Sequence, residues 1–236
     1  MIEKLHQKNI QFVAASGRQY QKLYESFGPV ADEIAYICEN GAVLILHGDL
    51  IHECVLDHGN VLDMIRDARK VDNAHLLVCT KDCAYLETDH PAVMKQVKMY
   101  HSNIEILENL ERVPKEIIKM SMVDLLQAES NGYAKLAPHW KDRLILTVST
   151  PTWTDIYHKE TSKGVALKKL QEHYQAIYEE TMVFGDYFND VSMLKQAKYS
   201  YAMANAPEGV KAEATYGAPS NKEYGVLQVI YDRILG

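Results

Sequence analysis

The sequence predicts an α/β protein with two domains, one inserted into the other. Short apolar runs alternate with helical patterns near both ends of the chain, which is typical of a parallel sheet covered by helices. The middle, about residues 48–157, mixes hairpin signals with helices. A length of 236 residues lies between the expectations for one domain and for two. We therefore expect an α/β domain formed by residues 1–47 and 158–236, with an α+β domain inserted between them.

The N-terminal flank predicts helices and apolar strands in alternation. In order, the expected elements are a helix over 1–8, a strand over 10–15, a helix over 19–27, and strands over 34–38, 42–46 and 50–56. Gly48-Asp49 separates the last two apolar runs, which is a hairpin signal.

The inserted segment predicts an α+β order. The expected elements are a helix over 61–68, strands over 75–79 and 84–87, a helix over 91–99, a strand over 117–123, a helix over 125–135, and a strand pair over 144–149 and 153–157. Pro91 suits the first turn of its helix, because the N–H that proline lacks would have no partner there. Pro151 lies in the turn of the last strand pair.

After the insert the alternation of helix and strand returns. The expected elements are helices over 163–174, 191–196, 207–214 and 225–235, and strands over 182–184 and 199–203. Pro207 begins its helix, and the last helix is amphipathic. The two flanks together supply the strands of the expected parallel sheet.

Composition and charge exclude several classes of protein. Apolar residues make up 47% and charged residues 24%, as in soluble globular proteins. The net charge of −7 argues against a surface that wraps nucleic acid. No apolar stretch approaches the ~20 residues of a membrane span, so we expect no membrane association and a cytoplasmic location. The cysteines, at positions 38, 54, 79 and 83, lack zinc or redox spacing and are expected to stay reduced.

Three polar clusters follow expected strands or lie next to them, where open α/β sheets bind ligands. Residues 16–18 (Ser-Gly-Arg) follow the strand over 10–15, and residues 186–190 follow the strand over 182–184. Lys163 opens the helix that precedes the latter strand. Each cluster also has an ordinary interpretation, because serine and aspartate cap helices and a lone lysine is usually solvated.

Together the three clusters favour phosphoryl chemistry. A hydroxyl and backbone N–H groups at Ser16 and Gly17 can hold an anion, and Lys163 adds a positive charge suited to phosphate. The loop after the second strand offers the oxygen ligands that Mg²⁺ prefers, from Asp186, Asn189 and Asp190. A phosphoryl-transfer site needs groups that bind an anion, a positive charge, and a carboxylate that can hold a metal ion.

These segments resemble the haloacid dehalogenase superfamily, and more narrowly its Cof-type phosphatases with a type IIB cap, which usually act on sugar phosphates. The motifs are GDYFNDVSML (185–194), AASGR (14–18) and SKGVALKKL (162–170). Supporting matches are ENGAVL (39–44), AMANAPEGVKAEA (202–214) and EYGVLQVIYDRIL (223–235). The resemblance implies a Rossmann-like core, with the insert over 48–157 as a cap that selects the substrate.

The resemblance also implies roles for single residues. Ser16 resembles the second family motif, which hydrogen-bonds the transferring phosphoryl group, and Lys163 resembles the third-motif lysine. Asp186 looks like the fourth-motif Mg²⁺ ligand, with Asn189 and Asp190 as partners that orient the metal's ligands and the lysine. Further substrate-binding candidates implied by position are Gly17, Arg18, Asn40, Gly41 and Asn205. The implied cofactor is Mg²⁺, and the implied partner is a small phosphorylated metabolite.

The family's first motif, Asp-x-Asp-Gly-Thr, does not occur in the 236 residues. In the family its first aspartate is the nucleophile, and its second is the general acid and base and also contributes a metal contact through its backbone. The family places the strand of this motif between those expected here over 10–15 and 182–184. Without it these two strands either pair directly or leave open edges. A second chain, as in a homodimer, is one way to fill the position.

Three interpretations follow for the activity. We expect a phosphatase-derived sequence that is shortened at its start and hydrolyses phosphate esters poorly. The alternative is a catalytically dead module of the same fold that binds phosphorylated ligands through Ser16 and Lys163. A different enzyme on the same core has the least support, because no other nucleophile is positioned.

Overall fold

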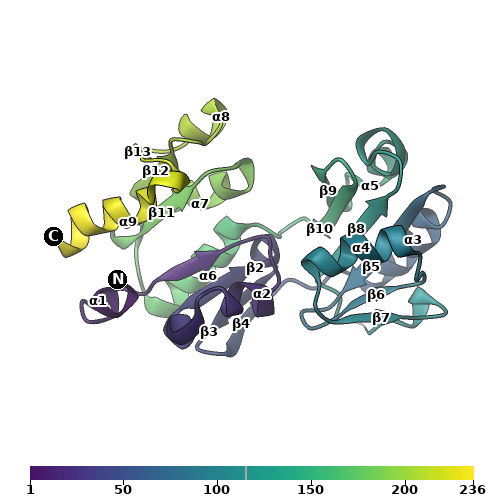
Figure 1. Cartoon of the computed structure of the whole chain (residues 1–236), viewed down its shortest axis with the longest axis horizontal. Helices are drawn as coiled ribbons and strands as arrows, with labels where there is room; N and C mark the ends of the chain where they lie inside the picture. Colours follow the sequence, from purple (N-terminus) through teal and green to yellow (C-terminus); the bar gives the residue numbers. More distant parts are fainter. Residues whose placement is uncertain (115) are drawn as a thin grey trace. The chain divides into compact units, whose positions relative to one another are not determined.

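The computed structural model describes residues 1–114 and 116–236, which form two compact units. The core unit contains residues 1–52 and 162–236, and the cap unit contains residues 53–161 (Figure 1). The boundaries predicted from the sequence, after residues 47 and 157, lie a few residues earlier. The first boundary differs because the second strand of the hairpin, residues 49–53, pairs within the core sheet. Among the described residues, no helix is long and apolar enough to cross a membrane.

The strands of the core unit form two sheets. The first has the order β1 (Val13–Ala15), β2 (Ala35–Cys38), β3 (Val43–Leu46) and β4 (Asp49–Glu53). The second has the order β11 (Met182–Gly185), β12 (Tyr199–Met203) and β13 (Tyr216–Ala218). β1 runs parallel to β2, and the strands of the second sheet are all parallel, whereas β2 and β3 are antiparallel. Of the two arrangements considered for β1 and β11, the structure shows separate sheet edges, within the residues it describes.

Helices hold the two core sheets together. They are α1 (Ile2–His6), α2 (Tyr20–Glu25), α6 (Lys163–Tyr174), α7 (Val191–Leu194), α8 (Glu208–Lys211) and α9 (Gly225–Ile230). Leu167 and Leu170 of α6 share one apolar cluster with Ile37 of the first sheet and Val183 of the second. α6 has the predicted bounds, because the hydroxyl of Ser162 accepts the N–H of Val165 at 3.1 Å and caps its first turn.

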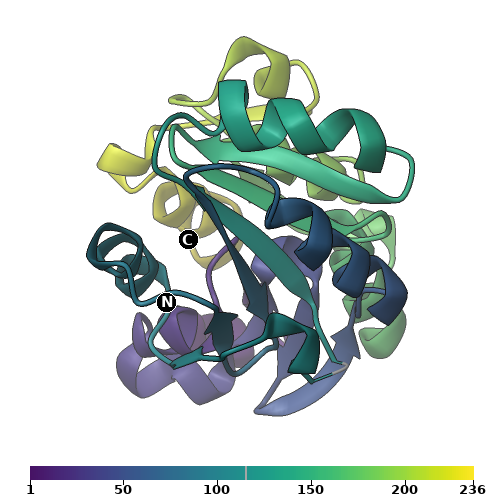
Figure 2. The same cartoon turned by 90° about the vertical axis from the view of Figure 1, so that its right-hand side faces the viewer.

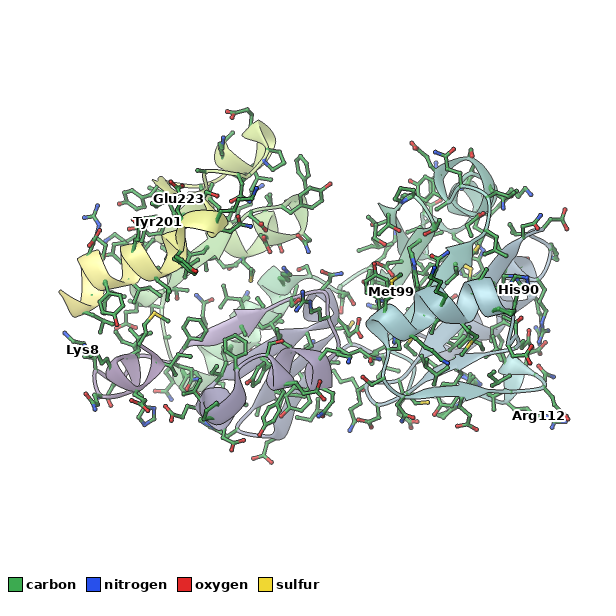
Figure 3. The ribbon with its side chains drawn as sticks, viewed as in Figure 1. Lys8, His90, Met99, Arg112, Tyr201 and Glu223 are labelled. Carbon is green, nitrogen blue, oxygen red and sulfur yellow. The ribbon has the colours of Figure 1, made fainter. Side chains whose placement is uncertain are left out.

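An aromatic ladder crosses the second core sheet. Tyr201 of β12 is labelled in Figure 3. The centroid of its ring lies 5.2 Å from that of Phe184 in β11 and 5.1 Å from that of Tyr216 in β13. Such cross-strand aromatic pairs stabilise a short parallel sheet and its register.

The cap unit contains one six-stranded sheet. Its strands, in spatial order, are β7 (Ile104–Ile106), β6 (Ala84–Leu86), β5 (Ala74–Cys79), β8 (Lys119–Asp124), β10 (Trp153–His158) and β9 (Leu144–Thr150). Only the β6–β7 pair is parallel among the pairs described. Helices α3 (His58–Ala68) and α5 (Ala134–Trp140) pack on one face, and α4 (Pro91–Tyr100) packs on the other (Figure 2).

The predicted helix over 125–135 is wrong in its bounds. Leu125 and Leu126 lie in a loop, because the buried carboxylate of Asp124 accepts the N–H of Leu126 at 2.8 Å. Its other oxygen accepts the side-chain N–H of Asn131 and the backbone N–H of Gly132, both at 2.9 Å. The helical segment begins only there, as a π-helical turn over Glu129–Tyr133 that continues into α5.

Short elements complete the fold. β7 and β13 have three residues each and give no periodic pattern, so the sequence did not predict them. The 3₁₀ turns are Gly28–Glu33, Glu39–Gly41, Leu110–Arg112, Tyr178–Glu180, Phe188–Asp190 and Asn221–Glu223, and a π-helical segment, Tyr231–Leu235, extends α9. The four cysteines are buried and form no disulfide among the described residues.

Candidate functional site

The carboxyl ends of β1 and β11 carry the candidate site of the core unit. Ser16 directly follows β1, and its N–H donates to the carbonyl of Ile37 at 2.8 Å, which extends the pairing with β2. The Ser16 Oγ accepts the N–H of Arg18 at 3.2 Å. Because the hydroxyl acts as an acceptor in this turn, its own hydrogen can be donated to an anion.

A tight turn at residues 39–41 connects this strand end to the loop after β11. Asn40 has a left-handed φ of 56°, which suits a short polar side chain. Its N–H donates to the carbonyl of Ser16 at 3.1 Å, and its Oδ1 accepts the side-chain N–H of Asn189 at 2.9 Å. Asn40 therefore joins the ends of two strands that belong to different sheets.

Two glycines allow the first turn of α6 to approach this region closely. A Cβ on Gly41, which has a φ of 100°, would overlap the carbonyl of Ser162. A Cβ on Gly164 would overlap the carbonyl of Ser192, whose Oγ accepts the N–H of Gly164 at 3.0 Å. Lys163 lies between these two contacts, so close backbone packing sets its position.

Lys163 forms a buried ion pair with Asp190. The Lys163 Nζ lies 2.6 Å from the Asp190 Oδ1, and the two side chains are only 6% and 8% exposed. The Asp190 Oδ2 accepts the N–H groups of Asp186, at 2.9 Å, and of Tyr187, at 3.2 Å. Both carboxylate oxygens are thus engaged, and Asp190 holds the lysine and the loop in one geometry.

Asp186 is half-buried at the start of the same loop. Its Oδ2 accepts the side-chain N–H of Asn205 at 3.2 Å, and the Oδ1 of Asn205 accepts the N–H of Asn221 at 3.1 Å. This chain of bonds orients one carboxylate oxygen of Asp186 and leaves the other for a ligand. Asn189 is exposed, and its side-chain carbonyl can also serve as a ligand.

The residues of this loop fit Mg²⁺ held in part by water and substrate. Within the described ranges, no group of three or more His, Cys, Asp and Glu side chains is arranged to hold a metal ion. Mg²⁺ commonly binds through one or two carboxylates and keeps waters and phosphate oxygens as its other ligands. Asp186 can supply that carboxylate. Asp190 would have to give up a bond to Lys163 or to the loop amides before it could do so.

The structure brings most of the predicted site residues together. The contacts above connect Ser16, Asn40, Gly41, Lys163, Asp186, Asn189, Asp190 and Asn205. Gly17 joins them, because a Cβ there would lie 3.1 Å from the Asn40 Oδ1. Arg18 is exposed, and it contacts the turn through its carbonyl, which accepts the N–H of Glu39 at 3.1 Å.

Sequence reasoning missed three residues that support this site. Ser162 caps α6, Ser192 binds Gly164, and Asn221 orients Asn205. Ser162 could have been found, because a serine just before a helical pattern is a capping signal. The other two act across long sequence separations that no local pattern reveals.

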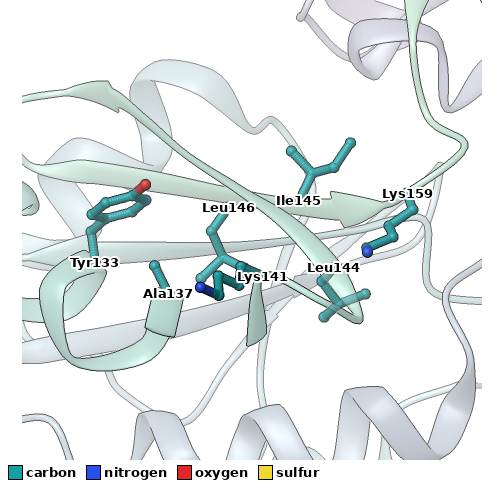
Figure 4. Close-up of a pocket in the computed structure, with 7 residues that line it drawn as sticks. All are labelled: Tyr133, Ala137, Lys141, Leu144, Ile145, Leu146 and Lys159. Carbon is teal, nitrogen blue, oxygen red and sulfur yellow. The ribbon is translucent and has the colours of Figure 1, made fainter. Parts of the chain in front are cut away.

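The cap unit contains a pocket whose lining includes none of the predicted site residues. It has a volume of about 360 Å³ and is lined by Tyr133, Ala137, Lys141, Leu144, Ile145, Leu146 and Lys159 (Figure 4). Its lining is mostly apolar, with two lysines and one tyrosine hydroxyl, and it contains no carboxylate.

Comparison with models of protein families identifies the family of this chain. The model of the haloacid dehalogenase-like hydrolases matches residues 1–230, nearly the whole chain. The chain belongs to this family. The resemblance found in its motifs is therefore confirmed.

Relatives of this haloacid dehalogenase-like hydrolase include phosphatases. The 5-amino-6-(5-phospho-D-ribitylamino)uracil phosphatase YbjI of Escherichia coli (strain K12) is 30% identical over 236 residues, which cover 99% of this chain and 86% of that protein. The solved structure of SMU.1108c from Streptococcus mutans UA159 is 30% identical, with a TM-score of 0.86, and the match covers 100% of this chain and 90% of that one.

The fold of this haloacid dehalogenase-like hydrolase also matches that of BT4131, a subclass IIB sugar phosphatase. The TM-score is 0.78 at 23% identity, and the match covers 98% of this chain and 88% of that one. This likeness concerns the fold, and it agrees with the expected core and cap. The roles of the single site residues stay predictions.

Proposed function

We propose that this haloacid dehalogenase-like hydrolase binds small phosphorylated metabolites, such as sugar phosphates, at the core-unit site, with Mg²⁺ as its cofactor. The hydrogen-bonded connection from Ser16 through Asn40 and Asn189 to the Asp186 loop is the observation that carries this proposal. It gathers a hydroxyl, a buried lysine and a carboxylate at the ends of two strands, and phosphoryl groups are bound by such sets.

Each of these residues has a task that follows from its contacts. The Ser16 hydroxyl donates its hydrogen to a phosphoryl oxygen. The ammonium of Lys163 keeps N–H donors for the phosphate beside the one given to Asp190. Asp186, oriented by Asn205, would hold Mg²⁺. Bound Mg²⁺ would supply charge neutralisation at the phosphoryl oxygens.

We further propose that these 236 residues by themselves hydrolyse phosphate esters poorly. The sequence contains no Asp-x-Asp-Gly-Thr motif, which supplies the nucleophile in the family that it resembles. In the described residues β1 and β11 are separate sheet edges, and no aspartate ends a strand between them. The homodimer and the cytoplasmic location expected from the sequence stay predictions.

A binding module without catalysis is the second candidate function. The same absence of a nucleophile favours it, because the phosphate-binding residues are in place while the attacking carboxylate is not. The two candidates differ in one respect: a phosphatase releases inorganic phosphate, and a binding module does not.

A ribityl phosphate is the first ligand to test. Two relatives, YbjI and YcsE of Bacillus subtilis (strain 168), are named as phosphatases of 5-amino-6-(5-phospho-D-ribitylamino)uracil. We propose ribitol 5-phosphate as the simplest compound that carries the same phosphorylated chain.

Calorimetry and phosphate release test these proposals. We expect the chain to bind ribitol 5-phosphate saturably with Mg²⁺, and Ser16→Ala to weaken binding roughly tenfold or more, the loss of a hydrogen bond to a charged group. Ser26→Ala is the control, because Ser26 is exposed, directly follows α2, and donates its hydroxyl to the Lys22 carbonyl of that helix. Asp186→Asn should remove the effect of Mg²⁺ on binding.

Two results would contradict the proposals. Absence of any binding would overturn the phosphate site. Strong Mg²⁺-dependent phosphate release by the 236-residue chain, abolished by Asp186→Ala, would overturn the expected poor activity.

A further inference from the structure

The two edge strands of the cap sheet differ in length and charge. β7, at one edge, has three residues, with Glu105 in the middle. β9, at the other edge, has seven residues, LILTVST, with no charged residue and no proline. Natural edge strands are usually kept from pairing with other chains by shortness, by charged side chains or by proline. β9 has none of these features, so its outer side, which we call the β9 edge, can accept a further strand.

The backbone at the β9 edge has no partner among the described residues. β9 pairs with β10 on one side only, from Leu144 to Thr150. Apart from this pairing, residues 144–149 make no backbone hydrogen bond within the described part of the chain. Because the N–H and C=O groups of alternate residues point to opposite sides of a strand, about half of those in β9 face away from β10. These groups can bond the backbone of a peptide that lies alongside.

The pocket shown in Figure 4 reaches the β9 edge. Its lining includes Leu144, Ile145 and Leu146, which follow one another in β9. Because successive side chains of a strand point to opposite faces, three consecutive residues line one pocket only where it reaches around the edge. Ala137 of α5 lines the same pocket, and Ile145 and Leu146 are only half-buried, so apolar surface is accessible there. An apolar side chain of a peptide paired with β9 can therefore pack into this pocket.

The charge of this pocket is opposite to that of the whole chain. Lys141 and Lys159 line it, both are exposed, and no carboxylate lines it. Neither lysine forms an ion pair among the described residues. The chain as a whole carries a net charge of −7. Both ammonium groups can therefore pair with acidic side chains of a partner, and they repel basic ones.

We propose that the β9 edge binds an extended peptide segment of another protein, in which apolar and acidic residues alternate. The main chain of the segment adds a strand to the cap sheet, an apolar side chain packs into the pocket, and acidic side chains pair with Lys141 and Lys159. A small anion would leave the outer backbone groups of β9 without partners, whereas a peptide supplies N–H and C=O groups for them. A second copy of this chain, paired through β9, would bring no acidic side chain from that strand. The inference concerns the cap unit and does not depend on the proposed phosphate site.

Nuclear magnetic resonance of the full chain tests this proposal, with two synthetic peptides of the length of β9 as probes. Both have capped ends; one alternates valine and glutamate, and the other alternates valine and lysine. We expect the glutamate peptide to shift the backbone amides of residues 145–149 saturably and to leave those of β7 unchanged. The lysine peptide should bind roughly tenfold more weakly, although the net charge of −7 attracts it, because it meets Lys141 and Lys159.

Charge reversal tests the part played by the two lysines. By calorimetry, a variant with both Lys141→Glu and Lys159→Glu should bind the glutamate peptide roughly tenfold more weakly, because two ion pairs are replaced by repulsion. The matched control combines Lys135→Glu with Lys98→Glu, which changes the net charge equally. Both of these lysines are exposed in the cap unit and do not line the pocket, so the control should bind like the wild type.

Four outcomes would overturn the proposal: no saturable shift in β9, equal shifts in β7, equal or tighter binding of the lysine peptide, or unchanged binding by the variant with both lysines reversed. A dimer of the chain alone that protects the β9 amides from hydrogen exchange would also overturn it, because a second copy would then occupy the edge. Phosphate binding and its loss in Ser16→Ala are measured separately, and Ser16→Ala should bind the glutamate peptide like the wild type. A failure of the peptide site is therefore distinguishable from a failure of the phosphate site.

Discussion

Both units contain a lysine–aspartate pair with a buried lysine, and the two pairs are built differently. In the core unit the Lys163 Nζ and the Asp190 Oδ1 are 2.6 Å apart, and the second oxygen of Asp190 accepts two backbone N–H groups. In the cap unit the Lys119 Nζ and the Asp155 Oδ1 are 3.5 Å apart, and that same oxygen also accepts the Ser121 hydroxyl.

The difference in distance and in bonded oxygens indicates how rigidly each aspartate holds its lysine. The core pair has both carboxylate oxygens bonded, so it acts as a fixed support for Lys163 and for the loop that begins at Asp186. The cap pair is longer, and only one oxygen of Asp155 takes part in the contacts to Lys119 and Ser121, so it holds its lysine less rigidly. A fully satisfied polar network is rigid.

Breaking the core pair should have the largest effect on stability. We expect Lys163→Met to lower the free energy of unfolding by about 3–5 kcal/mol, because it leaves a buried carboxylate without its partner. Lys119→Met should cost less, about 1–3 kcal/mol, since Asp155 is more exposed and keeps its bond to Ser121. Urea denaturation measures both. If Lys119→Met lowered the free energy of unfolding as much as Lys163→Met or more, the proposed difference between the two pairs would be wrong.

Close backbone packing in the core should give the next largest effect. Gly41 and Gly48 both have positive φ, 100° and 86°, so alanine is strained at either position, by about 1–2 kcal/mol. Gly41→Ala should cost about 1–3 kcal/mol more, because its Cβ overlaps the Ser162 carbonyl while nothing lies within 4 Å at Gly48. The difference in stability between the two variants, measured by thermal denaturation, gives the cost of the overlap at Gly41 alone. Equal costs would show that α6 does not need its close approach.

The pH dependence of stability should reveal the buried imidazole of His101, whose pKa is influenced by Lys119 and Asp155 of the cap pair. The His101 pKa is about 4 in the folded state, below the ordinary value of 6.5, so the unfolded state binds the proton first as the pH falls. Stability is therefore full above pH 6.5 and is lost as the pH falls towards 4, by roughly 2 kcal/mol between pH 7 and 5. His101→Phe should lack this loss, and His139→Phe should keep it. Identical slopes in the wild type and in His101→Phe would refute the assignment.

The smallest effect should come from the hydroxyl that supports the first turn of α6. Ser192→Ala removes the acceptor of the Gly164 N–H and should cost about 1 kcal/mol. The control in the cap unit is Ser130→Ala, since Ser130 is exposed and its Oγ lies 3.3 Å from Gln127. If both variants matched the wild type, the Ser192 contact would not stabilise the site.

Local patterns predicted the long elements and the residues of the candidate site. α6 has the bounds expected from its apolar spacing, and Ser162, which the sequence reasoning missed, caps its first turn. The loop over 186–190 follows β11 as expected, because a polar run after an apolar run ends a strand. The helix expected over 125–135 starts later, because the side chain of Asp124 takes up backbone N–H groups that no periodicity records.

By itself, the sequence determined the family, the order of the longer elements and the absence of a nucleophile motif, because these depend on neighbouring residues and their spacing. Only the tertiary structure decided that β1 and β11 lie on separate edges, and that Asn40 joins their ends. It also decided that Lys119 meets Asp155 beside His101. Strand order and register bring together residues that are far apart in the chain, and no local pattern specifies those contacts.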